Sequence, residues 1–266
     1  MRKIIKIGRV HWSYLDSEKG DEVWLGFHGF GQGAEVVNHF LKTLRPDARI
    51  LSFDLPLHGE TFVEKGFIKP GELAELLGKA LIETDVKSCN LFGFSLGGKV
   101  VLKMVELAPG KIDRVVLIAP DGLKVNPFYG FATNTVIGRL LFKLIIRFPQ
   151  PFLGTSWILA KSRLMNPKIH DFVTSQMGNK EKRQKVYDTW QIFKKTVPNL
   201  DDVRKKIWRY RMKLTLVFGI NDRVIHPKLA KKLSGDNCKS ASVIMLNAGH
   251  HLLTKKHAEV LKDQIQ

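Results

Sequence analysis

The sequence predicts an α/β fold in which a mostly parallel central sheet is flanked by helices and interrupted by a helical insertion. Short apolar runs rich in β-branched residues alternate with segments of helical periodicity through the first half of the chain. The alternation stops after Ala119 and resumes at Leu214. The 266 residues, 44% hydrophobic and 26% charged, match a globular chain with a substantial core. Because parallel strands need crossover connections, we expect helices on both faces of the sheet.

Each strand is predicted from an apolar run that ends at a turn or helix signal. The predicted strands are Val23–Phe27, Arg49–Phe53, Asn90–Phe94, Arg114–Ala119, Leu214–Phe218 and Ser242–Leu246. Helices are predicted between them, over residues 36–44, Glu72–Ile82, Gly97–Leu107 and Lys228–Leu233. This order assigns residues 1–120 and 214–266 to one sheet domain, the core of the fold.

Residues 121–213 are predicted to form a helical cap, or lid, inserted into that core. Prolines interrupt the segment, and no Gly/Ser linker separates it from the core. It holds 19 Lys and Arg against 6 Asp and Glu, and 13 of the 25 aromatic residues. An apolar inner face would bind an acyl or aryl group, and a cationic rim would attract an anionic substrate. Single basic runs, such as residues 180–185, are more simply explained as solvated helix faces.

The net charge of +18 and the pI near 9.9 raise the question of a polyanionic partner. No recognised nucleic-acid-binding motif is present, so we expect no nucleic acid partner. No run approaches the roughly 20 apolar residues of a membrane span, so we expect no stable membrane insertion. Leu140–Phe148 would suit a helix on a membrane surface, but a lid helix is the more economical interpretation. The lack of a secretory signal pattern, and only two cysteines, Cys89 and Cys238, favour a reducing, cytoplasmic location.

The segment GFSLG, Gly93 to Gly97, fits the GxSxG pattern of a serine on a sharp turn between a strand and a helix. The pattern alone is a weak signal, but here it follows a predicted strand and precedes a predicted helix. Ser95 would then project at the carboxyl edge of the sheet, where the helix N-terminus favours developing negative charge. We therefore take Ser95 as the candidate nucleophile.

A serine hydroxyl needs a base, and that base needs a group to orient it. Asp222 follows the Leu214–Phe218 strand, and the adjacent residues His250 and His251 follow the last strand. Each lies at the carboxyl end of a parallel strand, where α/β proteins gather their sites. The chain thus offers a serine, an acid and a base at one edge of the sheet, with the choice of histidine open.

With these motifs in that order, the sequence resembles the α/β-hydrolase superfamily over nearly the whole chain outside the insertion. The resemblance implies an oxyanion hole made by the backbone N–H groups of Phe30, in the His28-Gly29 turn, and Leu96. It favours His250 as the base because this residue follows a glycine, with His251 as the alternative. Asp121 occupies a position that some relatives use for the acid, so it is the alternative to Asp222.

One motif departs from the family. Members carry an Asp-x-Pro-Gly-x-Gly turn after the fourth strand, whereas this chain reads DLPLHGE from Asp54 to Glu60, with Leu57 in place of a glycine. The departure bears on subfamily membership and not on the fold.

The sequence therefore predicts a serine hydrolase that cleaves a carboxylic ester or related acyl bond of a small-molecule substrate, with no cofactor and no metal. A thioesterase, a carbon–carbon bond hydrolase and a menaquinone-type lyase share the same triad and stay open. A non-catalytic ligand-binding protein of the same fold is the alternative of another class. The sequence is also compatible with a homodimer.

Overall fold

In the computed structural model, residues 1–266 are described except for 65, 163–173, 175–177, 236–240 and 266. Part of the predicted helical insertion and Cys238 therefore lie outside the described residues. The chain divides into two compact units. The sheet unit comprises residues 1–124 and 195–266, and the helical unit comprises residues 125–194.

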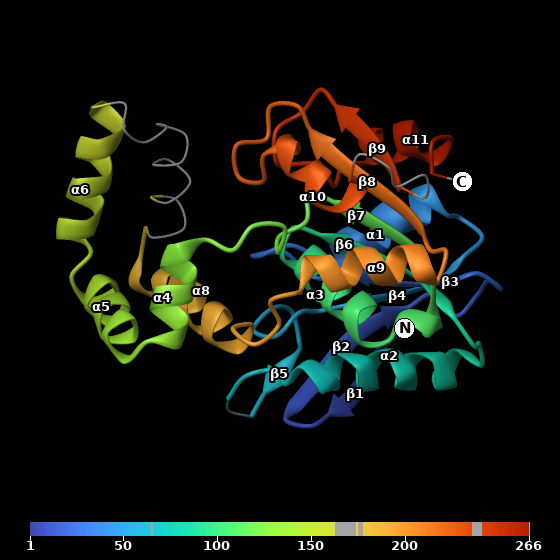
Figure 1. The fold of residues 1–266 in the computed structure, drawn as a ribbon. Helices are drawn as coiled ribbons and strands as arrows, with labels where there is room; N and C mark the ends of the chain where they lie inside the picture. Colours follow the sequence, from blue (N-terminus) through green and yellow to red (C-terminus); the bar gives the residue numbers. More distant parts are fainter. Residues whose placement is uncertain (65, 163–173, 175–177, 236–240, 266) are drawn as a thin grey trace. The chain divides into compact units, whose positions relative to one another are not determined.

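The sheet unit is built on a single twisted sheet. Among the described residues it has nine strands in the order β1-β2-β4-β3-β6-β7-β8-β9, with β5 paired to β2 (Figure 1). From β4 to β9 all neighbours are parallel. The strands in this part are β3 (Val23–Phe27), β4 (Arg49–Phe53), β6 (Cys89–Phe94), β7 (Ile112–Ile118), β8 (Lys213–Gly219) and β9 (Ala241–Leu246). The predicted α/β fold with a mostly parallel sheet is thus confirmed.

Three strands were not predicted. β1 (Arg2–Ile7) and β2 (Val10–Asp16) form an antiparallel pair that extends the sheet beyond β4, and the short β5 is Phe62–Val63. Most of β1 is exposed or half-buried, whereas every residue of β3 is buried. A mixed run such as RKIIKI lacks the continuous apolar character of a strand that is covered on both faces.

Helices cover the two faces of the sheet in two groups. α1 (Ala34–Leu44) contacts α11 (Lys255–Lys262), and both contribute to the main apolar core with alternate residues of the central strands. α2 (Pro70–Thr84), α3 (Leu96–Leu107) and α9 (Leu200–Arg209) contact one another in sequence, α3 lying between the other two. The sheet is therefore buried in its centre, and the strand ends between these layers are left to form a site.

The boundaries of the two units differ from the predicted 121–213 insertion. Residues 195–213 belong to the sheet unit, where α9 packs on α3 and its Val203 and Ile207 are buried. An amphipathic helix has the same sequence pattern whichever unit it packs on, so periodicity could not assign α9. The predicted helix at Lys228–Leu233 is a 3₁₀ turn, Pro227–Ala230, followed by the short α10, Lys231–Ser234.

The helical unit is held together by aromatic side chains. Its helices are α4 (Pro127–Asn134), α5 (Val136–Arg147), α6 (Gln150–Lys161) and α8 (Lys180–Ile192). Phe142 of α5 is buried, and its ring contacts Phe128, Tyr187 and Trp190, with centroids 5.3 to 6.2 Å away. The guanidinium of Arg183, also buried, donates to the carbonyl of Ile146. α4, α5 and α8 thus share one small core.

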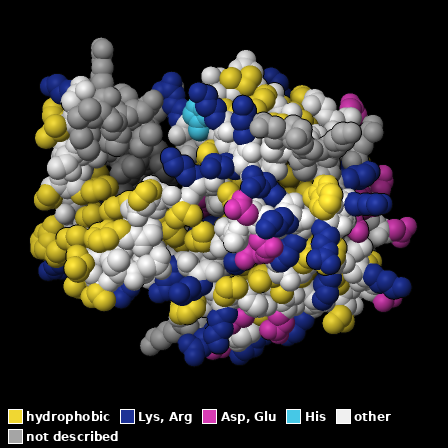
Figure 2. Space-filling model, viewed as in Figure 1, with side chains coloured by type: hydrophobic (Ala, Val, Ile, Leu, Met, Phe, Trp, Pro, Cys, Tyr) yellow, Lys and Arg dark blue, Asp and Glu magenta, His cyan; other side chains and the backbone are white. Residues whose placement is uncertain are grey.

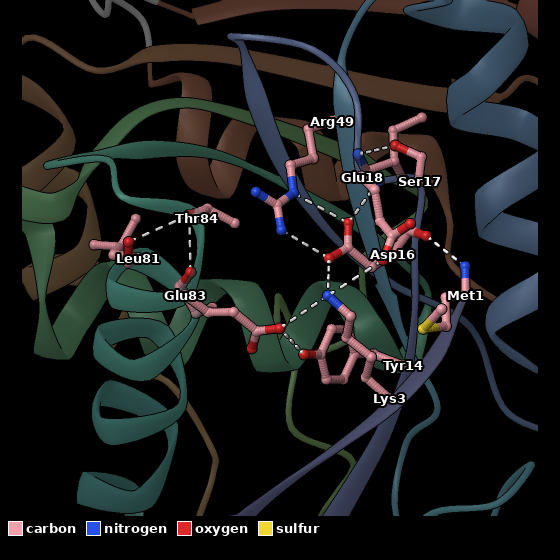
Figure 3. Close-up of polar contacts among 12 residues, drawn as sticks. Met1, Lys3, Tyr14, Asp16, Ser17, Glu18, Arg49, Leu81, Glu83 and Thr84 are labelled. Atoms are coloured by element: carbon pink, nitrogen blue, oxygen red, sulfur yellow. Dashed lines mark hydrogen bonds and ion pairs between the residues drawn. The ribbon is translucent and has the colours of Figure 1, made fainter.

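A buried carboxylate ties the antiparallel strands to the parallel sheet (Figure 3). Asp16, at the end of β2, bonds the ammonium of Lys3 at 2.8 Å and the guanidinium of Arg49 at 2.8 and 3.1 Å. Burial would raise the pKa of Asp16, but the hydrogen bonds from Arg49 and Lys3 hold it well below its usual range. Glu83 of α2 accepts from Lys3 and from the Tyr14 hydroxyl, which extends the network to the helix layer.

Candidate active site

Ser95 lies on a strained turn between β6 and α3. Its φ of +48° and ψ of −114° belong to a region that residues with side chains rarely adopt. Glycines make the turn possible: a Cβ at Gly93 would lie 2.7 Å from the Gly97 carbonyl oxygen, and one at Gly97 would lie 2.1 Å from the Phe27 carbonyl oxygen. The Ser95 N–H donates to Ile118 of β7 at 3.0 Å. The turn is therefore fixed by the neighbouring strands.

Asp222, His250 and Ser95 form one hydrogen-bonded chain. His250 Nδ1 lies 2.7 Å from Asp222 Oδ2, and His250 Nε2 lies 3.1 Å from Ser95 Oγ. Because a carboxylate only accepts, Nδ1 carries the hydrogen, and Nε2 is left to accept the hydroxyl proton of Ser95. The Asp222 side chain is fully buried, and its other oxygen accepts the N–H groups of Val224 and Ile225. The carboxylate is thus held in one orientation.

The structure places the two alternative residues differently. His251 is exposed, whereas its neighbour His250 makes both contacts of the chain. Asp121 accepts the N–H of Gly122 with its carboxylate at 2.7 Å, and its own N–H donates to the Ser95 carbonyl at 2.8 Å. Asp121 therefore supports the backbone of the serine turn, and the hydrogen-bonding partner of the histidine is Asp222.

The His28–Gly31 turn is fixed by two histidine rings. The Nε2 of the buried His28 accepts the N–H of Leu55, and the Nε2 of His58 accepts the N–H of Gly31, both at 2.9 Å. Gln32 accepts the N–H of Gly29 at 3.0 Å. The Phe30 amide thus lies between two amides that donate to side chains. No sequence pattern indicates this role for His58, because its partner Gly31 lies 27 residues away.

Contacts bring this turn against the start of α3. A Cβ at Gly29 would lie 2.9 Å from the Phe94 ring, and one at Gly97 would lie 2.8 Å from the His28 carbonyl oxygen. Leu96 is the first residue of α3, and the first N–H groups of a helix have no partner within it. The amides of Phe30 and Leu96 therefore belong to two segments in contact beside Ser95, as an oxyanion hole requires.

Leu57, which stands where the family turn has a glycine, adopts a backbone conformation that favours glycine. In the turn that begins at Asp54, Leu57 has φ +65° and Gly59 has φ +50°. A Cβ at Gly59 would lie 2.1 Å from Asp54 Cγ, so that glycine is required by space. Asp54 accepts the N–H of Ala34, at the start of α1, at 2.7 Å. The turn thus holds Leu57 in a strained, left-handed backbone conformation.

A buried cation lies one helical turn beyond Ser95. The side chain of Lys99 is nearly inaccessible to solvent, and burial lowers the pKa of its ammonium, while the Asp121 carboxylate acts in the opposite direction.

Cys89, at the start of β6, is a free, buried thiol whose pKa burial raises well above its usual value, so it is not a competing nucleophile. In the described part of the chain, no three His, Cys, Asp or Glu side chains are grouped so as to hold a metal ion.

The chain belongs to the alpha/beta hydrolase fold family. The family model matches residues 25–256, which include the serine turn, Asp222 and His250. The match extends from β3 to α11 and so covers both units of the structure.

Named relatives include acyl-transfer proteins and esterases. The chain is 32% identical over 158 residues to the dihydrolipoyllysine-residue acetyltransferase component of the acetoin cleaving system of Pseudomonas putida, covering 56% of this chain and 41% of that protein. It thus spans well under half the length of that relative. It is 23% identical to the uncharacterized hydrolase YugF of Bacillus subtilis, covering 92% of this chain and 89% of that protein. It is also 23% identical to a pimeloyl-[acyl-carrier protein] methyl ester esterase of Pectobacterium atrosepticum, with 91% of both chains covered.

Solved structures share the fold at lower identity. A carboxylesterase structure from Nitrososphaera gargenis matches with a TM-score of 0.66 at 17% identity, covering 99% of this chain and 97% of that one. A thermophilic esterase of Thermogutta terrifontis matches with a TM-score of 0.66 at 16% identity, covering 100% and 96% of the two chains. At such identities the likeness concerns the fold, and the chemistry must be argued from the site.

Proposed function

We propose that this protein is a serine hydrolase that cleaves a carboxylic ester or a related acyl bond through an acyl-enzyme intermediate. The observation that carries the proposal is the chain of two hydrogen bonds from Asp222 through His250 to Ser95. Such a chain activates a hydroxyl that would otherwise be a poor nucleophile. Relatives named as esterases make the ester the first substrate class to test.

The reaction follows from the roles of the three side chains. Ser95 Oγ attacks the carbonyl carbon while His250 Nε2 accepts its proton, and the tetrahedral intermediate collapses when His250 returns that proton to the leaving alcohol. Water then enters, gives a proton to His250 and attacks the acyl-enzyme, which releases the acid and restores Ser95. Asp222 stays ionised, holds the imidazole in one tautomer and stabilises the imidazolium.

The backbone N–H groups of Phe30 and Leu96 would stabilise the negative charge that develops on the carbonyl oxygen, by donating hydrogen bonds to it. Donors already aimed at a developing oxyanion are worth about 2.7–4 kcal/mol each in the transition state. The helix N-terminus that begins at Leu96 adds its dipole to the same position. The His28 and His58 hydrogen bonds act indirectly, because they hold the backbone that carries the Phe30 amide.

The first experiment asks whether Ser95 is a nucleophile. Wild-type protein should be labelled by a fluorophosphonate probe, and Ser95→Ala should not. Folded wild-type protein that takes no label would overturn the proposal and favour the non-catalytic binding protein. His250→Ala and His251→Ala form a matched pair. The first should lose nearly all turnover of a model ester and the second should keep it, whereas equal mild losses would reject His250 as the base.

The bond type is the second question. A panel of aryl esters, acyl thioesters and vinylogous diketones separates an esterase from a thioesterase and from a carbon–carbon bond hydrolase, all of which use this triad. We expect the highest kcat/KM for esters.

The basic insertion adds a proposal on specificity: kcat/KM for anionic acyl substrates should fall with added salt more than for neutral ones. An equal response of both substrate types to salt would show that these basic residues are only solvated surface charges and do not attract the substrate.

A further inference from the structure

The helical unit exposes a stripe of large apolar side chains on α5. Val136, Ile137, Leu140, Leu141 and Leu144 are between 46% and 66% exposed. At helical spacing they occupy one continuous face, while Phe142 and Ile146 point to the small core on another. Figure 2 shows hydrophobic side chains gathered over α4 and α5. Contiguous apolar surface of this kind marks an interaction site.

A row of cations runs along the edge of this stripe. Arg139, Lys143 and Arg147 follow one another at intervals of four residues, which places them side by side on α5. The Arg147 guanidinium lies 5.6 Å from the centre of the exposed Phe148 ring. Long basic side chains can keep their charged ends in a polar layer while their stems lie along apolar surface. The helix thus presents an apolar face and a cationic row next to each other.

The next helix repeats the combination. Trp157 and Ile158 of α6 are more than half exposed, and the ammonium of Lys161 lies 4.9 Å from the centre of the Trp157 ring. Tryptophan and lysine are residues that gather at the boundary between lipid tails and headgroups. α6 contacts α5 within the unit, so the two helices offer similar surfaces on one small body.

The charge of the unit decides which partner fits. From residue 122 to residue 170 the chain has seven Lys and Arg and no Asp or Glu. Residues 125–194 carry a net charge of +8 and the remaining residues +10. A second copy of the helical unit would therefore meet the cationic row with net positive charge of its own. An anionic surface with an apolar interior complements both the row and the stripe.

We infer that α5 and α6 dock the protein on the surface of an anionic lipid membrane. α5 has 12 residues, about 18 Å of helix, too short for the roughly 30 Å hydrocarbon core. In the described part of the chain, no helix has the length and apolarity to span a bilayer. The helices would lie in the headgroup plane, with the stripe in the upper acyl region and the cations at the phosphates.

The test is co-sedimentation of the full chain with vesicles. We expect binding to phosphatidylcholine vesicles that contain phosphatidylglycerol, loss of binding in high salt, and weak binding to phosphatidylcholine alone. Lys143→Gln with Arg147→Gln should weaken binding by at least about tenfold, because each charge near the surface is worth roughly fivefold. Lys19→Gln with Lys87→Gln, two exposed lysines of the sheet unit, is the matched control and should bind as wild type.

The apolar stripe has its own pair of variants. Leu140→Ser with Leu144→Ser should weaken binding by more than about tenfold. Ile82→Ser with Trp208→Ser removes two even more exposed apolar side chains from the sheet unit and should bind as wild type. Brominated lipid should quench tryptophan fluorescence in the wild type and in Trp208→Phe, but less in Trp157→Phe.

Three outcomes would overturn the inference: no binding of wild-type protein to anionic vesicles, equal losses in the stripe variants and their controls, or a dimer in solution that the stripe variants dissociate. The last would assign this face to a second copy. Ser95→Ala should bind vesicles as well as wild type does. The inference about membrane docking and the proposed hydrolase activity can therefore be disproved independently of each other.

Discussion

The sheet unit and the helical unit use their apolar residues in different ways. In the sheet unit, strands such as β3 and β6 are buried at every residue, because α1 and α11 cover one face of the sheet and α2, α3 and α9 cover the other. In the helical unit, α5 buries Phe142 and Ile146 but exposes most of its other apolar side chains. The first unit holds the residues of the candidate site in place through a sheet that is buried on both faces. The second unit holds itself together with one aromatic cluster and leaves surface for a partner.

The largest expected effect concerns the site in the sheet unit. Asp222→Asn should lower kcat for a model ester by about 10⁴-fold, because an amide favours the wrong tautomer of His250. The fold should survive, since the amide oxygen can still accept the N–H groups of Val224 and Ile225. Asp121→Asn is the matched control and should change kcat by much less. Steady-state kinetics with circular dichroism measures both, and a larger loss of kcat in Asp121→Asn than in Asp222→Asn would identify Asp121 as the acid.

The aromatic cluster of the helical unit gives the next effect. Phe142→Ala should destabilise that unit by about 3–5 kcal/mol, the usual cost of deleting a buried phenyl ring. Phe148→Ala, one residue beyond the same helix, removes an exposed ring and should change stability by about 0.5 kcal/mol or less. Hydrogen exchange of α5 and α8 is the measurement. Equal loss of protection in both variants would mean that the cluster does not hold the unit together.

Within the sheet unit, Asp16 allows the contribution of a buried carboxylate and its ion pairs to the free energy of unfolding to be measured. Asp16→Asn should cost about 1–3 kcal/mol, because the half-buried charges of Lys3 and Arg49 would lose their buried carboxylate partner. Asp21→Asn, an exposed residue nearby, should be neutral within about 0.5 kcal/mol. Urea denaturation at neutral pH gives both values. A free energy of unfolding that is the same in Asp16→Asn as in the wild type would show that the network of Figure 3 contributes little to stability.

The same residue predicts a pH dependence. The pKa of Asp16 is depressed in the folded protein, so its contribution is complete above the ordinary aspartate pKa of about 3.9. Below that pH the unfolded chain takes up a proton that the folded protein does not bind, and stability falls. The stability difference between wild type and Asp16→Asn should therefore shrink as the pH is lowered from about 6 to 3. A difference that is constant over this range would contradict the assignment.

The smallest expected effect is a gain. Leu57→Gly should relieve the strain of the positive φ at this turn. Because glycine makes the unfolded chain more flexible, folding then loses more entropy, so the net change should be a stabilisation of about 1 kcal/mol or less. Thermal denaturation compared with Leu57→Ala, which keeps the strain, separates the two contributions. A loss of stability in Leu57→Gly would show that the leucine side chain compensates for its backbone.

The residues that the structure brings together were predictable where chain order and strand ends determine position. Ser95, Asp222 and His250 each follow a parallel strand, and parallel strands place their carboxyl ends at one edge. The choice of His250 over its neighbour rested on the family resemblance. The central strands could be predicted because burial on both faces requires continuous apolar runs.

Other features depend on contacts that no local pattern reports. The bond of His58 to the Gly31 amide joins two loops, and the packing of α9 on α3 joins segments about 100 residues apart. β1 and β2 are held to the sheet by long-range pairing and by the Asp16 ion pairs, not by hydrophobicity alone. Such features are set by tertiary neighbours, so periodicity and motif spacing leave them undetermined.

The absence of carboxylates from residues 122–170 has a further consequence. Residues 122–162 contain no Asp, Glu, His or Cys, the residue types that ordinarily change charge between about pH 4 and 9. The charge of α5 and α6 is thus a constant of the molecule over the physiological range. Acidification would not release these helices from an anionic surface, and ionic strength or a change in the lipids would be the variables that do.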